Sequence, residues 1–260
     1  MNTRTIIIVI GAVLVAVGAY FIISEPEPAE PVAAPPVMPL EEPTIEVPVE
    51  QKATPVEALK PIAAVIDTKV KAPSTLDGSD IKVMLAVADI SNDLAQWLVP
   101  EEQIRKWVLF IDNAANGDLI AKHRPWQYSM KSLVAANIGN KKYLAPSNYQ
   151  RAKPLLAGVM SIPPAKLADY YYSWSPLLEK AYRELGKAGS FDTRFKQAID
   201  KVLAAKSLPA EPELKLPSVM YQYQDKSLET ASDIDKLIWR LGFENTNDIQ
   251  QYLRDLKSRL

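Results

Sequence analysis

The chain has 260 residues, a formal net charge of −1, one histidine and no cysteine. The absence of cysteine excludes disulfides, thiolate metal sites and cysteine nucleophiles, and a single histidine excludes multi-histidine metal sites. A net charge so close to zero gives no sign of a nucleic-acid partner, so no nucleic acid is expected.

The first distinctive element is an uncharged apolar run at residues 6–23, IIIVIGAVLVAVGAYFII. As a helix this run would span about 27 Å, close to the hydrocarbon thickness of a bilayer. It ends in bulky residues and not in the small residues of a signal-peptide cleavage site, so residues 1–24 are predicted to form an uncleaved transmembrane anchor.

The charges that flank the run predict its orientation. Arg4 precedes it, and no lysine or arginine follows before Lys52. The excess of positive charge on the cytoplasmic side then places residues 1–5 in the cytoplasm and the rest of the chain across the membrane. In a Gram-negative bacterium this topology is a single-pass inner-membrane protein with a periplasmic domain.

Residues 25–75 are predicted to be a disordered linker. They contain eleven of the chain's 21 prolines and no glycine, with glutamate, valine and alanine among most of the others. Proline removes backbone donors and fixes φ, so neither a helix nor a sheet can propagate, and polyproline II geometry makes the segment a stiff spacer.

Residues 76–260 are predicted to form one compact helical domain. Apolar residues recur at helical spacing in several segments, each bounded by a capping residue, a proline or a glycine. Pro176 lies inside the longest segment, where the apolar repeat continues and a kink is expected. About seven helices are predicted, at residues 80–98, 100–116, 147–160, 163–185 and 190–203 and in two final segments, before and after Gly242.

A small β element is predicted among these helices. Gly139-Asn140 separates residues 132–136 from 142–144 and can supply the positive φ of a short hairpin. The segment 214–222 is expected to be extended, because a proline at 217 disfavours helix before it and the residues that follow alternate in polarity.

Several short motifs occur in an order that resembles a known bacterial family. They are LVPEEQIRKWV with FIDNAANG, then KHRPW, APSNYQRAKPLL, PLLEKAYRELG, FDTRF and LPSVMYQY. The family is catalogued as domain of unknown function 3014, and the resemblance covers about residues 76–257. Its members share the order of membrane span, proline-rich stretch and domain. The resemblance therefore implies a bacterial envelope setting, and it implies no catalytic or binding residues.

The motif His123-Arg124-Pro125-Trp126 is the first part of a candidate functional surface. A lone histidine can act as a general base, and the proline would hold the turn rigidly. The favoured alternative is that His123 and Arg124 hydrogen-bond carbonyl groups at helix ends.

Tyr172 completes this candidate surface of His123, Arg124, Trp126 and Tyr172. Its neighbours Tyr170, Tyr171 and Trp174 fall on the apolar stripe of their predicted helix and are expected in the core. Tyr172 faces elsewhere, where it could contribute to a sugar- or peptide-binding surface.

No catalytic, cofactor-binding or metal-binding residue is predicted. The sequence has no glycine-rich phosphate loop, no serine nucleophile elbow and no calcium-binding loop. Its many carboxylates lie mostly on polar helix faces, so paired acids give no specific sign of glycoside hydrolysis.

The favoured function is that of a non-enzymatic envelope protein. Its linker would present the helical domain, as a binding or scaffold module, to an envelope protein or to peptidoglycan. Two alternatives stay open: an enzyme acting on the cell wall or on a small molecule through His123 and Arg124, and a ligand sensor with a deep apolar pocket.

Overall fold

The computed structural model describes residues 68–129, 132–208 and 211–260. The predicted anchor and the predicted linker up to residue 67 lie outside these ranges. Among the described helices, none combines the length and the apolar character that crossing a bilayer would need.

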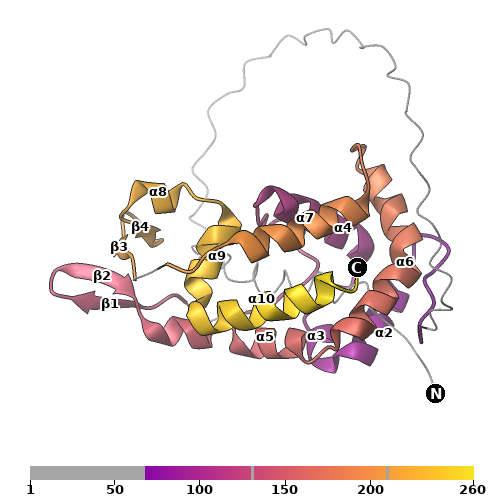
Figure 1. Cartoon of the computed structure of the whole chain (residues 1–260), viewed down its shortest axis with the longest axis horizontal. Helices are drawn as coiled ribbons and strands as arrows, with labels where there is room; N and C mark the ends of the chain where they lie inside the picture. The colour runs from indigo at the N-terminus through magenta and orange to yellow at the C-terminus, as the bar shows by residue number, and fades with distance from the viewer. Residues whose placement is uncertain (1–67, 130–131, 209–210) are drawn as a thin grey trace, which may run out of the picture. The chain divides into compact units, whose positions relative to one another are not determined.

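The described part of the chain is mainly helical with a small antiparallel sheet, as predicted (Figure 1). It contains nine α-helices in the described ranges, more than the seven expected, because some predicted helices are divided and short ones are added. The helices are α2 (Asp80–Ile90), α3 (Asn92–Ala95), α4 (Gln103–Asn116), α5 (Lys153–Met160), α6 (Pro164–Glu184), α7 (Phe191–Ala204), α8 (Lys226–Glu229), α9 (Asp233–Leu241) and α10 (Phe243–Lys257). The strands are β1 (Ala135–Ile138), β2 (Lys141–Leu144), β3 (Glu213–Lys215) and β4 (Gln222–Tyr223), and the 3-10 helix η2 spans Pro146–Gln150.

The main hydrophobic core lies between α4, α6, α7 and α10. Its largest fully buried side chains include Trp107 of α4 and Trp174 of α6. Burial of one large apolar side chain contributes about 1.5–3 kcal/mol relative to exposure, so the helical stripes account for the packing of these helices. Tyr170 and Tyr171 of α6 are also buried, which confirms that they belong to the core.

Residues 68–75, which the sequence assigned to the linker, pack on α6. Val70 is buried, and its carbonyl accepts a hydrogen bond from Nε1 of Trp174 at 3.1 Å. The hydroxyls of Thr68 and Ser173 are 3.0 Å apart, and the Lys69 amide donates to the hydroxyl of Tyr170 at 3.2 Å. The folded region therefore includes residues before 76.

The helix predicted over residues 80–98 is interrupted at Ser91. Ser91 has extended backbone, and its side chain accepts the amide of Leu94 to begin α3. Serine competes for backbone donors in this way, and the interruption coincides with the weakest part of the apolar repeat. Asp80, the first residue of α2, accepts the amides of Glu102 and Gln103 at 3.0 and 2.8 Å, and so caps α4.

The four strands form one antiparallel sheet in the order β1-β2-β3-β4. The predicted hairpin is present, with Ile138 opposite Lys141 and a turn at Gly139, whose φ is 60°. Leu144, Leu214 and Tyr223 from three of the strands form a second, smaller hydrophobic cluster. Figure 1 shows the hairpin extending from the helices at the left of the view, with β3, β4 and α8 above it.

Candidate functional site

The loop after α4 carries His123 and Arg124. His123 is exposed, with φ at 66° in the left-handed region, which is uncommon for a residue other than glycine. Nε of Arg124 donates to the carbonyl of Ala121 at 2.9 Å. The guanidinium therefore stabilises its own loop, which is the kind of structural role that the favoured alternative gives to Arg124.

Trp126 is buried and is not part of a surface, which corrects its inclusion in the candidate surface. Its ring stacks on Trp107 at a centroid distance of 5.2 Å and meets Phe110 edge-on at 4.8 Å. The preceding Pro125 was expected only to stiffen the turn, but its carbonyl also accepts Nε2 of Gln103 at 2.7 Å. The proline and the tryptophan together hold the loop on α4.

Tyr172 is half-buried on α6 and lies beside the end of the chain. Its hydroxyl donates to the backbone oxygens of Leu260 at 2.6 Å and Arg259 at 3.2 Å. Tyr172 is thus positioned by α6 and by the residues after α10, whereas Trp126 is positioned by α4. The four candidate residues are therefore held by different elements: His123 and Arg124 lie in the loop after α4, Trp126 packs on α4, and Tyr172 lies on α6.

A buried charge cluster joins α4 to α7, and sequence analysis did not identify it. Asp112 is only 1 % exposed, and its carboxylate pairs with Lys187 and, at 2.7 Å, with Nε of Arg194. Arg194 also donates to the Asp112 carbonyl at 2.6 Å and to Oδ1 of Asn116 at 2.7 Å. Both carboxylate oxygens are occupied, so this cluster is suited to fixing the helices and poorly suited to proton transfer. The sequence signal for this cluster was the acidic residue Asp112 within the apolar stripe of residues 104–115.

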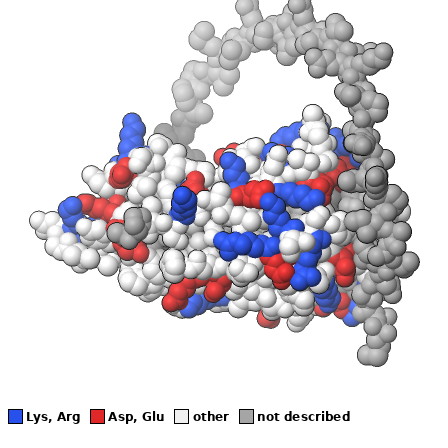
Figure 2. Space-filling model, viewed as in Figure 1, with Lys and Arg blue, Asp and Glu red and all other residues white. Residues whose placement is uncertain are grey.

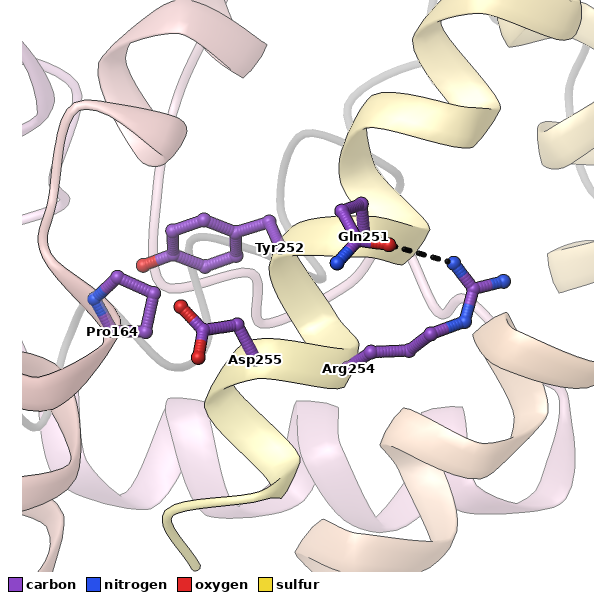
Figure 3. Close-up of a pocket in the computed structure, with 5 residues that line it drawn as sticks. All are labelled: Pro164, Gln251, Tyr252, Arg254 and Asp255. Atoms are coloured by element: carbon purple, nitrogen blue, oxygen red, sulfur yellow. Dashed lines mark hydrogen bonds between the residues drawn. The ribbon is translucent and has the colours of Figure 1, made fainter.

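An open pocket of about 460 Å³ lies between the start of α6 and the last turns of α10 (Figure 3). Tyr252 and Asp255 point toward Pro164, while Arg254 points the other way, toward Gln251. The Tyr252 hydroxyl is buried and has no hydrogen-bond partner among the described residues, and burial raises the pKa of this phenol. Polar and apolar surface line this pocket in similar amounts and it is open to solvent, unlike the deep apolar pocket expected of a ligand sensor.

Exposed apolar side chains gather at one end of the sheet. β2 leaves the turn at Gly139, and β3 runs back toward it, because Lys142 pairs with Leu214 and Tyr143 with Glu213. The loop between β3 and β4 therefore lies at the same end as the hairpin turn. We call Ile138, Leu216, Val219 and Met220 the sheet tip; their exposed fractions are 66, 45, 67 and 52 %.

The sheet tip was missed because residues 214–222 were read as one extended segment. Pro217 and Ser218 instead separate two very short strands, and the residues between the strands form a loop. The signal was the presence of a proline and a serine within a run that otherwise alternates.

Charged side chains of both signs are interspersed over the face formed by α4, α7 and α10 (Figure 2). Arg105, for example, pairs with Glu184 at 2.8 Å and with Asp77 and Glu102 at 2.9 Å, and these carboxylates raise the pKa of its guanidinium. No cluster of three metal-ligating side chains occurs within the described ranges.

A family model described as "Protein of unknown function (DUF3014)" matches residues 103–257. The match runs from the first residue of α4 to the last residue of α10. No curated protein and no solved structure matches the chain.

Proposed function

The chain belongs to the DUF3014 family, and from this premise we propose that it is a membrane-anchored binding module that presents its helical domain to another protein of the cell envelope. Residues 6–23 hold it in the inner membrane with residues 1–5 in the cytoplasm. The proline-rich segment that follows carries the domain into the periplasm, away from the membrane.

The observation that carries this proposal is the sheet tip. Its four apolar side chains are 45–67 % exposed and come from the last residue of β1 and from the β3–β4 loop, at one end of the sheet. A compact group of exposed apolar residues on a domain is typical of a protein interaction site. The hydroxyls of peptidoglycan would gain little from such a surface, so a protein partner fits it better.

The proposal is tested by proximity labelling in intact cells, with the labelling enzyme fused after Leu260. The unaltered chain should label a reproducible envelope protein. The double variant Val219→Ser, Met220→Ser should lose that labelling, because it removes two of the four exposed apolar side chains of the tip. Shortening the spacer to about ten residues should also lose it, because the domain then stays near the membrane.

Ile81→Ser on α2 is the matched control, because Ile81 is 74 % exposed but lies outside the sheet tip. The control should keep the labelling of the unaltered chain. Labelling that survives both the tip variant and the short spacer would refute the proposal.

A further inference from the structure

The outer edge of β1 has free hydrogen-bonding groups. Ala145 donates to the carbonyl of Val134 at 3.0 Å, and this bond continues the register in which Ala135 is opposite Leu144. Bonded and non-bonded pairs alternate in an antiparallel ladder, so Ala136 and Ile138 direct their backbone groups toward β2, and the Val134 amide, on the same side, donates to Oδ1 of Asn148 at 2.9 Å. The amides and carbonyls of Ala135 and Asn137 therefore point away from the sheet, and no described residue bonds to them.

The opposite edge of the sheet, at β4, is protected, whereas the edge at β1 is open. The amide of Tyr223 in β4 points outward and donates to the carboxylate of Glu229 in α8 at 2.8 Å. β1 has no such cover among the described residues, and its sequence AANI contains neither a charge nor a proline. Exposed edges without these protections pair readily with another strand.

We propose that β1 pairs antiparallel with β1 of a second copy, which joins two sheets into one of eight strands. In each copy, the outward amide and carbonyl of Ala135 then bond to the outward carbonyl and amide of Asn137 in the other copy. In this register Ala136 faces Ala136 across the two-fold axis, and Val134 faces Ile138. Val134, which directly precedes β1 and is 51 % exposed, and Ile138, which ends β1 and is 66 % exposed, thus cover each other.

The charges near β1 fit a second copy better than a charged peptide. Lys141 is already paired with Glu213 at 2.7 Å, and Nζ of Lys142 donates to Oδ1 of Asn137 at 3.0 Å. In the paired register Lys141 is in line with Val134 and Ala145 of the other copy, so no like charges face each other. The paired residues 134–138 are uncharged in both copies, which is compatible with self-pairing across a two-fold axis.

The pairing should be weak. Two four-residue edges bury less than the roughly 1,000 Å² that stable interfaces need. Confinement in one membrane would raise the effective concentration of the copies and favour the dimer. This last point rests on the proposed anchor, whereas the pairing geometry does not.

Cysteine crosslinking tests the register, because the natural chain has no cysteine. In a non-bonded antiparallel pair the Cα atoms are about 4.5 Å apart, within disulfide range. Full-length Ala136→Cys in membranes should therefore give a disulfide-linked dimer under mild oxidant. Val134→Cys and Ile138→Cys should crosslink when the two variants are co-expressed and not when each is expressed alone.

Two further changes separate edge pairing from random collision. Asn140→Cys, in the exposed turn, should not crosslink, because the register keeps the two turns far apart. Asn137→Pro removes the outward amide, together with the side-chain acceptor of Lys142 Nζ, and should abolish the Ala136→Cys dimer. Ile138→Lys keeps both of these groups and should also abolish the dimer, so the loss does not depend on a proline in the hairpin. Equal crosslinking at residues 136 and 140, or an Ala136→Cys dimer that survives both changes, would overturn the proposal. Loss of the dimer in Asn137→Pro, with labelling of an envelope protein unchanged, would leave the proposed function intact. Ile138→Lys does not serve for this comparison, because Ile138 also belongs to the sheet tip.

Discussion

Asp112 is a carboxylate on the buried side of α4 whose two cationic partners differ in exposure. The Lys187 side chain is 46 % exposed, whereas that of Arg194 is 19 % exposed and also donates to the Asp112 carbonyl. Solvent can replace a partner that is half exposed, but it cannot easily replace one that is enclosed. The two partners should therefore contribute unequally to stability.

We predict that Arg194→Met lowers the free energy of unfolding by about 2–3 kcal/mol, because it leaves a buried carboxylate with one partner. Lys187→Met should cost less than about 1 kcal/mol. Urea unfolding of the purified protein followed by tryptophan fluorescence measures both. Adding Asp112→Asn to Arg194→Met should recover part of the loss, and equal costs for the two single changes would contradict this assignment.

At the scale of the helices, two carboxylates each cap a helix other than their own. Asp80 of α2 accepts two amides at the start of α4, and Glu179 of α6 accepts the amides of Phe191 and Asp192 at 3.0 Å at the start of α7. A negative charge at a helix N-terminus is favourable, and here it also fixes one helix against another.

Asp80→Ala should lower the free energy of unfolding by about 1 kcal/mol, because it leaves two amides of α4 without their acceptor. Asp80→Asn, which keeps one side-chain oxygen, should cost less. Hydrogen exchange of the Glu102 and Gln103 amides, measured by NMR, should accelerate in Asp80→Ala. Unchanged exchange at these two amides would show that Asp80 does not cap α4 in solution.

These caps show which parts of the fold can be read from the sequence. The apolar repeat predicted α4, α6 and α7 closely, and Gly117, with φ at 95°, ends α4 as expected. A repeat reports only which side of a helix is buried, so it could not show that Asp80 would bind a different helix. The hairpin turn was also predicted, but the pairing of β2 with β3 was not, because those strands are about seventy residues apart.

At the scale of the whole molecule, the candidate surface was predicted less well than the fold. Residue type drew attention to His123 and Trp126, but burial of the tryptophan depends on packing that sequence does not report. The bond from Arg124 to a backbone carbonyl is of the kind that the favoured alternative expected, although Ala121 lies in the loop and not at a helix end. The sheet tip and the β1 edge became visible only when residues far apart in sequence were placed at one end of one sheet.

The boundary between the proposed spacer and the folded region is also a property of the whole molecule. Val70 is 3 % exposed, and its segment contributes three polar contacts to α6, through Ser173, Tyr170 and Trp174. A chain that begins at residue 76 would expose the apolar surface that Val70 covers and leave the buried indole N–H of Trp174 without its acceptor. Such an unpaired buried donor costs about 1–3 kcal/mol.

Residues 76–260 should therefore unfold at lower urea concentration than residues 67–260, by an amount equivalent to about 2–4 kcal/mol. In the longer chain, Val70→Ser should reproduce part of the loss, whereas Ser74→Ala, at an exposed position, should have little effect. Identical midpoints for the two chains would place the boundary at residue 76 and make residues 68–75 part of the spacer. A lower midpoint for the shorter chain would mean that the spacer ends where Thr68 meets α6, so that its reach is set by the residues before 68.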